Sequence, residues 1–214
     1  MKFIKGEVYH IYNRGNNSQT IFFGEENYHY FLKKIRTELL PFCDILAYCL
    51  MPNHFHIMIF VNWVELESSP PASATPSSNQ SNNTQISNSF DELRVVTKSK
   101  TLNSAIAILL RSYTRAIQKQ HGFTGSLFQQ KTKAKLLDNQ TGTGLNYPSV
   151  CLHYLHQNPL RAGLVKNLED WHFSSFRDYA KLRSGTLCNQ NLGFLITGIR
   201  EVDFLKESLD VKLE

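Results

Sequence analysis

Hydrophobic and polar positions along the chain fall into segments with two different periods. Apolar residues recur three and four positions apart over residues 25–40 and 101–120, which predicts two helices with one buried face each. Other segments are rich in β-branched and aromatic residues or alternate at every second position, and these predict strands over residues 7–14, 44–51, 54–61 and 125–137. A Pro-Asn pair separates the second strand from the third, which predicts a hairpin.

A third helix is expected after the fourth strand, over residues 148–158. Pro148 suits its first turn, and Pro159 is expected to break it. The amphipathic residues 171–183 are expected to pack as a short helix or a strap. The order β-α-β-β-α-β predicts an α/β (α+β) fold of the ferredoxin-like or RRM-like type, with a split βαβ arrangement. We expect an antiparallel sheet with helices on one face, followed by a C-terminal helix.

One segment of the chain has neither period. Residues 68–89 hold no charged or aromatic side chain and consist mostly of Ser, Asn, Pro, Thr and Gln. Such a segment cannot bury enough apolar surface to offset the entropy lost on ordering. We therefore predict a single domain over residues 1–183, interrupted by a flexible insertion at about residues 65–97 and followed by a C-terminal extension over residues 184–214.

Composition excludes several classes of protein. Apolar residues make up 42% of the chain and aromatic residues 12%, which is typical of a globular protein. No apolar run is long enough for a signal peptide or a membrane span. The four cysteines show no C-x-x-C spacing, which argues against a zinc knuckle or a redox dithiol. We expect a cytoplasmic, nucleoid-associated protein without a membrane partner.

Positive charge is concentrated in one region. The whole chain has a net charge of +5, but residues 93–137 contain nine Lys and Arg residues and no Asp or Glu. Such segregation is typical of a protein that binds a polyanion such as nucleic acid, and the alternative is a solvated surface. The expected DNA contacts here are the helical stripe and the strand face formed by Arg111, Arg115, Lys119, Lys131, Lys133 and Lys135.

Two histidines lie two positions apart on the predicted strand 54–61. His54 and His56 leave the same face of the strand because strand side chains alternate, whereas Phe55 and Ile57 occupy the other face. Two imidazoles on one face can hold a metal ion or a phosphate. The pair alone is a weak signal, because most such pairs are packing or surface residues.

Tyr154 and Asn158 lie four positions apart and therefore on one face of the predicted third helix. Most helical tyrosines belong to the core, but a tyrosine beside a basic sheet can also attack phosphate as a nucleophile. A cation held by His54 and His56 would stabilise the charge that develops. With the Asn158 amide oxygen and phosphate oxygens as further ligands, this donor set suits Mg²⁺ or Mn²⁺, and Zn²⁺ is the alternative.

Residues 50–56, Leu-Met-Pro-Asn-His-Phe-His, resemble the HUH motif (His, bulky hydrophobic residue, His) of single-tyrosine transposases. The resemblance is to the insertion-sequence-200-like group, which includes the REP-associated tyrosine transposases. It covers about residues 5–62 and 100–182, and its other supporting segments are YNRGN at 12–16, GSLFQ at 125–129, YLHQNPLRAGL at 154–164 and WHFSSF at 171–176.

The resemblance implies a function and a set of site residues. Tyr154 would be the nucleophile that cleaves single-stranded DNA and forms a 5′-phosphotyrosine link, in DNA transposition or the processing of repeat hairpins. His54 and His56 would bind Mg²⁺ or Mn²⁺ with a third ligand, Asn158, for which Gln157 is the alternative because many members use Gln. The partner would be single-stranded or hairpin DNA, and a homodimer is left open because relatives act as dimers or as monomers. On the first strand, the expected DNA contacts are His10 and Arg14.

Two other classes of function remain open. A non-catalytic single-strand binding module of RRM-like shape would keep the basic region but would not need His54, His56, Tyr154 and Asn158 together. A metallohydrolase that uses the histidine pair would not need the tyrosine. A covalent protein–DNA adduct would distinguish all three.

Overall fold

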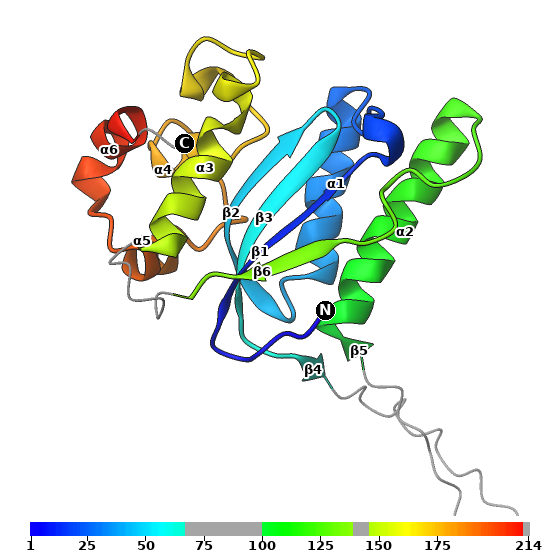
Figure 1. Cartoon of the computed structure of the whole chain (residues 1–214), viewed down its shortest axis with the longest axis horizontal. Coiled ribbons are helices and arrows are strands. Elements are labelled where there is room, and N and C mark those ends of the chain that lie inside the picture. The colour runs from blue at the N-terminus through cyan, green and yellow to red at the C-terminus, as the bar shows by residue number, and fades with distance from the viewer. Residues whose placement is uncertain (67–99, 139–145, 212–214) are drawn as a thin grey trace, which may run out of the picture.

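A computed structural model describes residues 1–66, 100–138 and 146–211 (Figure 1). Its main sheet is antiparallel, with the strand order β2-β3-β1-β6. The four strands are β1 (Val8–Arg14), β2 (Cys43–Met51), β3 (His54–Val61) and β6 (Lys133–Leu136). Helix α1 (Glu25–Glu38) connects β1 to β2, and α2 (Leu102–His121) precedes β6. This order, with the first strand between the third and the last, is that of the split βαβ fold and confirms the predicted fold class.

The register of the sheet decides which side chains share a face. Tyr12 of β1 lies opposite His56 of β3 on one side and Lys133 of β6 on the other, and Arg14 lies opposite His54. Directly opposed residues in an antiparallel sheet point to the same side. These five side chains therefore lie on one face.

The other face of the sheet is packed against α1 and α2. Phe55 and Ile57 are both 1% exposed and belong to a core that includes the apolar stripes of both helices. From α1 and α2 this core contains Tyr28, Phe31, Ile35, Ile106, Leu109, Tyr113 and Ile117. Burial of each such side chain contributes on the order of 1.5–3 kcal/mol, so this face fixes the orientation of the sheet.

Helix α3 (Tyr147–Arg161) covers the face that carries the histidines (Figure 1). Leu152 and Leu155 are fully buried there in a core shared with Leu46 and Met58 of the sheet. The prediction of helices on one face thus holds for α1 and α2, and the C-terminal helix lies on the opposite face. Around α3 lie the short helices α4 (Phe176–Tyr179), α5 (Gln190–Thr197) and α6 (Phe204–Asp210).

The predicted break at Pro159 is wrong, because α3 continues to Arg161 with Pro159 buried inside it. Proline cannot donate a backbone hydrogen bond, but the bonds after it are made: Ala162 N donates to Asn158 O, and Leu164 N donates to Pro159 O. Gly163 then ends the helix with a positive φ of 68°, a conformation that glycine adopts without strain.

Strand β6 is shorter than the predicted strand 125–137. It begins at Lys133, so Lys131 lies in the irregular segment before it. That segment is held by the last residue of β1 and the turn after it, because Gln129 N donates to Arg14 O and Asn16 N donates to Leu127 O. These bonds satisfy part of its backbone outside the regular ladder of β6 with β1.

Residues 171–183 combine a strap with a short helix, as expected. Leu50 N donates to Phe173 O and Ser175 N donates to Tyr48 O, which ties the strap along the edge strand β2. The strap continues into α4, where the carboxylate of Asp178 is buried and paired with Arg183 at 2.6 Å. An edge strand covered in this way is protected from pairing with other chains.

A small sheet of β4 (Glu65–Leu66) and β5 (Lys100–Thr101) flanks residues 67–99. The predicted insertion at about residues 65–97 lies almost entirely outside the described residues. In the described parts of the chain, no helix has the length and apolar character needed to cross a membrane. All four cysteines are free thiols.

Candidate functional site

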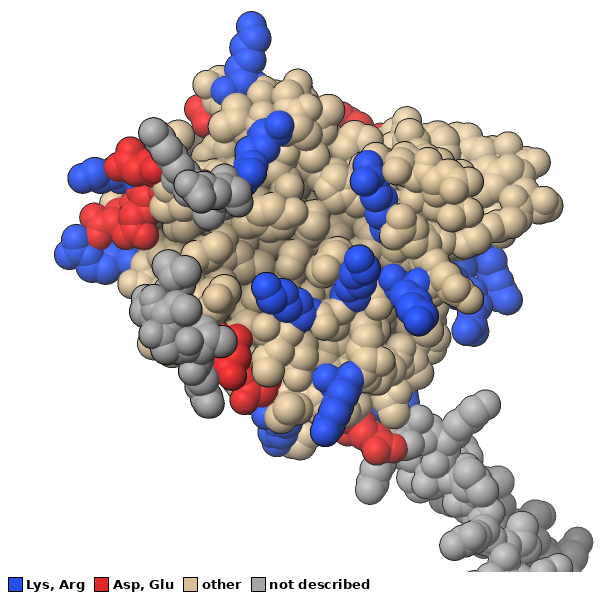
Figure 2. All heavy atoms as spheres, in the orientation of Figure 1, with Lys and Arg blue, Asp and Glu red and all other residues tan. Residues whose placement is uncertain are grey.

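The face of the molecule crossed by β6 is rich in Lys and Arg. Figure 2 shows these side chains spread over the middle of that face, with the visible acidic side chains nearer its margins. Lys133 and Lys135 of β6 lie opposite Tyr12 and His10, so they share the sheet face of the histidines. Their ammonium groups lie 5.8 Å from the ring of Tyr12 and 5.6 Å from the ring of Tyr147, respectively. This part of the predicted lysine face is present in the structure.

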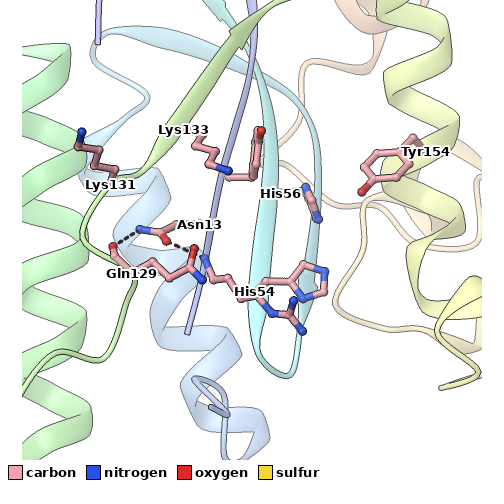
Figure 3. A pocket seen from close by; sticks show the side chains of 9 residues that line it. Asn13, His54, His56, Gln129, Lys131, Lys133 and Tyr154 are labelled. Carbon is pink, nitrogen blue, oxygen red and sulfur yellow. Dashed lines mark hydrogen bonds between the residues drawn. The ribbon is translucent and has the colours of Figure 1, made fainter. Parts of the chain in front are cut away.

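A pocket with a volume of about 420 Å³ opens on the same face. Strands β1 and β3, helix α3 and the segment leading into β6 all contribute to its wall (Figure 3). Its lining residues are Tyr12, Asn13, Arg14, His54, His56, Gln129, Lys131, Lys133 and Tyr154. The fold thus brings together residues from four separate parts of the sequence.

The two histidines are held in the pocket by their Nδ1 atoms. His54 Nδ1 lies 2.6 Å from Asn53 Oδ1, and His56 Nδ1 lies 2.8 Å from His10 Nε2. The His56 side chain is buried, and its Nε2 atom has no hydrogen-bond partner in the described part of the chain. A buried, unpartnered ring nitrogen that borders a pocket is available to a ligand.

Burial keeps both imidazoles neutral. It lowers the pKa of His54 to about 4, with a smaller contribution from the positive charge of Arg14. It lowers the pKa of His56 well below its usual range, with further contributions from His10 and His54. A neutral imidazole has one nitrogen lone pair, which a metal ion requires.

Tyr154 approaches the histidines from α3. Its ring centroid lies 5.5 Å from that of His56 in an edge-to-face arrangement. Figure 3 shows the hydroxyl end of Tyr154 pointing from α3 toward His56. The start of α3 is fixed by Asn146, whose side chain accepts a hydrogen bond from Ser149 N. The tyrosine and the histidine pair predicted from the sequence therefore meet in one pocket.

The two candidates for a third ligand lie in different surroundings. Gln157 is buried, and its Nε2 donates to Ser208 O at 3.0 Å and to Val211 O at 2.8 Å, so its amide is engaged by the C-terminal segment. Asn158 is not among the residues that line the pocket, but its Nδ2 is buried without a hydrogen-bond partner among the described residues. A metal ion would be bound by an amide oxygen rather than by the nitrogen, so these contacts leave the choice of third ligand a prediction.

The donor set of the pocket fits a divalent cation only if other ligands take part. Within the described ranges, no group of three or more His, Cys, Asp and Glu side chains is placed to hold a metal ion. Two neutral imidazoles, one with an unpartnered Nε2, are compatible with a cation that completes its shell with an amide, phosphate oxygens and water. By themselves, the described His, Cys, Asp and Glu side chains do not complete the shell of a structural metal ion.

The structure separates the remaining predicted DNA contacts into two groups. Arg14, Lys131 and Lys133 line the pocket. Arg111, Arg115 and Lys119 are exposed on α2, which packs against the opposite face of the sheet, and none of them lines the pocket. The six basic residues of 111–135 therefore lie on both sides of the sheet, and their contacts with DNA stay a prediction.

His10 also differs from the expectation. Its side chain is only 8% exposed, and its ring is stacked against both Tyr12 and His56, with ring centroids 4.8 Å and 5.0 Å away. A residue buried in this way offers little surface to DNA. Within the site, the His10 ring contacts His56 instead.

Asn13 and Gln129 are pocket residues that the sequence analysis did not identify. Asn13 Nδ2 donates to Gln129 O at 3.1 Å and to Thr132 Oγ1 at 2.9 Å, and its Oδ1 accepts from Arg14 N. This buried amide fastens the end of β1 to the segment that carries Lys131. The available signal was the position of Asn13 in the segment Tyr-Asn-Arg-Gly-Asn at 12–16, which supports the resemblance but assigns no role to Asn13.

This separation of charges predicts different effects on DNA binding. Changing Lys133 and Lys135 together to Ala should flatten the slope of log K against log salt by about 1.4 units, since each lost contact with single-stranded DNA removes about 0.7. The matched change of Arg111 and Arg115 to Ala also removes two charges, but from the opposite side of the sheet, and should leave the slope unchanged. Titrations of labelled single-stranded DNA at several salt concentrations measure both slopes. Equal slopes in the two variants would contradict a DNA path over β6.

Comparison with known proteins gives one result at the level of fold. No family model matches the sequence, and no curated protein matches it. A solved structure of a REP-associated tyrosine transposase bound to a REP hairpin is similar, with a TM-score of 0.52 and 17% sequence identity. The similarity covers 85% of this chain and 83% of that one. At this level of identity it shows that the chain shares the mixed α/β fold of that transposase.

Proposed function

We propose that this protein is a transposase-type endonuclease and strand transferase that acts on single-stranded or hairpin DNA. The observation that carries the proposal is the meeting of Tyr154 with His54 and His56 in a pocket lined by cationic side chains. A single-strand binding module would not require a tyrosine and two neutral imidazoles in the same pocket. The fold shared with a hairpin-bound transposase also supports the proposal.

The cationic residues of the pocket would bind and orient the DNA backbone. Arg14 extends from the end of β1, and Lys131 and Lys133 lie on the other side of the pocket. Each can neutralise a phosphate, which would hold the strand across the histidines and in front of Tyr154. Positioning of this kind removes much of the entropic barrier to an in-line attack.

Tyr154 would then attack the scissile phosphate. Its phenolic oxygen bonds to phosphorus and loses its proton, and the bond from phosphorus to the 3′ oxygen breaks. The 3′ oxygen takes up a proton and leaves as a hydroxyl, while the downstream strand stays on the protein through a 5′-phosphotyrosine link. Attack by a 3′-hydroxyl on this link reverses the chemistry and rejoins a strand, which is the basis of transfer.

Hydrogen bonds from α3 to neighbouring segments would fix the helix that carries Tyr154. His156 Nε2 lies 2.9 Å from Ser175 Oγ, and Gln157 donates to the backbone of α6 and of the residue after it. These contacts are made by His156 and Gln157 and not by Tyr154, so they fix the backbone of the helix without engaging the tyrosine side chain. A nucleophile on a rigid element is presented in a reproducible geometry.

His54, His56 and Asn158 would hold a Mg²⁺ or Mn²⁺ ion. When bound, such an ion polarises the scissile phosphate and neutralises the charge that develops in the transition state. The residues themselves would supply two neutral imidazole nitrogens and the amide oxygen of Asn158.

The test of the proposed function is a covalent adduct. The full chain is incubated with Mn²⁺ and single-stranded DNA oligonucleotides that contain hairpins, labelled at either the 3′ or the 5′ end. A 5′-phosphotyrosine link retains the 3′ label on the protein in a denaturing gel and releases the 5′ label as a fragment with a free 3′-hydroxyl. DNA that binds tightly without any adduct would support the non-catalytic binding module.

A further inference from the structure

Both histidines of the pocket have their Nδ1 atom occupied by a neighbouring side chain. For His54 the neighbour is Asn53, whose Oδ1 lies 2.6 Å away. The other end of the same amide, Nδ2, donates to Ser18 O at 3.3 Å, which fixes the oxygen on the side of His54. A carbonyl oxygen can only accept, so His54 carries its proton on Nδ1 and keeps the lone pair on Nε2.

His56 has the equivalent contact with His10, at 2.8 Å between Nδ1 and Nε2. Either ring could donate, so the surroundings decide the direction. His56 Nε2 is buried, has no partner among the described residues, and borders a pocket that also contains Arg14, Lys131 and Lys133. These positive charges favour a lone pair facing the pocket over an N–H group, because the ring nitrogen with its lone pair is the negative end of the imidazole dipole. The proton of His56 is therefore placed on Nδ1, from which it is donated to His10.

The His10 ring is restricted enough to fix the direction of its hydrogen bond with His56. It lies on β1, and its ring is stacked against those of Tyr12 and His56, whose own centroids are 5.9 Å apart. With 8% of its surface exposed, it is too enclosed to turn toward solvent without disrupting the stack. A buried aromatic stack restricts the ring to one orientation, and the hydrogen bond then restricts its neighbour.

We infer that His10 and Asn53 are positioning residues, which hold His56 and His54 in the tautomer protonated on Nδ1 so that both Nε2 lone pairs face the pocket. This inference rests on the proposed function in one respect, since a divalent cation is the ligand that would use the two lone pairs. It explains why His10 is a histidine in a buried position that an apolar residue could fill. Partners of this kind fix ring orientation and raise the basicity of metal-binding histidines.

The experiment measures tautomers directly and metal affinity separately. Long-range ¹H–¹⁵N spectra of the metal-free full chain, labelled at histidine, report which ring nitrogen of His54 and His56 carries the proton. Mn²⁺ binding is measured by the loss of the free-ion electron paramagnetic resonance signal. The wild type should show the Nδ1-protonated tautomer at both positions.

Two substitutions of His10 separate a positioning role from a packing role. His10→Phe keeps an aromatic ring in the stack but removes the acceptor. It should shift His56 away from the Nδ1-protonated tautomer and weaken Mn²⁺ binding by about 10- to 100-fold. His10→Gln places an amide oxygen near the position of Nε2 and should restore most of the affinity. His29→Phe on α1 makes the same chemical change at an exposed position and serves as the control, with no effect on either measurement.

The outcomes distinguish this inference from the proposed function. A wild-type protein in which His56 is protonated on Nε2 would overturn the inference, whatever the metal affinity. Unchanged tautomers and Mn²⁺ affinity in His10→Phe would do the same. A wild type with both histidines protonated on Nδ1 but without measurable Mn²⁺ binding would support the inference and contradict the metal role in the proposed function.

Discussion

Tyr154→Phe is expected to abolish the covalent adduct with single-stranded DNA while DNA binding is nearly unchanged. The substitution removes the attacking oxygen and leaves the ring, which lies edge-to-face with His56. Loss of one hydroxyl changes a binding free energy by about 1 kcal/mol, so the Kd for DNA should rise by no more than about fivefold. Adduct formation on a denaturing gel and a binding titration with the same oligonucleotide measure the two quantities in parallel.

Variants of two other tyrosines test whether Tyr154 is the nucleophile. Tyr30→Phe on α1 makes the same chemical change outside the pocket and should leave the adduct intact. Tyr12 lines the same pocket and is the competing nucleophile. An adduct that persists in Tyr154→Phe and disappears in Tyr12→Phe would transfer the role to Tyr12. Mass spectrometry of the peptide that carries the nucleotide would identify the attached residue in either case.

Local patterns were sufficient to predict the strands over 7–14, 44–51 and 54–61, the helices over 25–40 and 101–120, and part of the site. The strand 54–61 has the predicted bounds, and its alternation places His54 and His56 on the face opposite Phe55 and Ile57. This succeeds because side-chain direction in a strand depends only on the parity of the position. The same reasoning identified Lys133 and Lys135 as members of one face.

Local patterns do not show how helices and strands are placed relative to one another. The stripe of Arg111 and Arg115 is correctly placed on the outer side of its helix, but periodicity does not say which face of the sheet that helix covers. The two groups of basic residues were therefore merged into one DNA path. His10 was misjudged for a related reason, because the depth of a histidine in a stack depends on its cross-strand neighbours rather than on its own strand.

Pro159 shows a third limit of prediction from the local sequence. A proline inside a helical pattern predicts a break because the ring removes one hydrogen bond and crowds the preceding turn. In the structure the proline is buried in α3, and the helix ends beyond it at Arg161. Burial of the surrounding helix in the core stabilises the continued helix, and this tertiary contribution has no signature in the local sequence.

Removal of the two histidines is expected to eliminate adduct formation that depends on Mg²⁺ or Mn²⁺. His54→Ala with His56→Ala removes both nitrogen donors of the proposed metal site, and EDTA should have the same effect on the wild type.

Asn158→Ala should weaken Mn²⁺ binding. Its neighbour Gln157→Ala is the matched control, because it removes an amide that contacts Ser208 and Val211 instead. That control should lower the free energy of unfolding by about 1–3 kcal/mol while the adduct still forms.

The lowest pH at which the adduct should still form follows from the burial of the histidines. With an ordinary histidine pKa of about 6.5, activity would fall as the pH drops below that value. Because burial lowers the pKa of His54 to about 4 and that of His56 well below its usual range, both rings remain neutral to a lower pH. The adduct yield in Mn²⁺ should therefore stay nearly constant from about pH 8 to about pH 5.5, where an unperturbed histidine would already be mostly protonated.

Stability has to be followed in the same experiment, because buried histidines outside the site also have lowered pKa values and make the fold less stable in acid. Burial lowers the pKa of His153 to about 4 and that of His156 to about 3. Below about pH 6.5 the unfolded chain binds protons that the folded chain does not, so the free energy of unfolding falls as the pH falls. Circular dichroism at each pH separates this loss of fold from protonation of the site. Full adduct yield in EDTA would exclude the metal role, and a yield that falls near pH 6.5 in a folded protein would mean that the two imidazoles titrate like exposed ones.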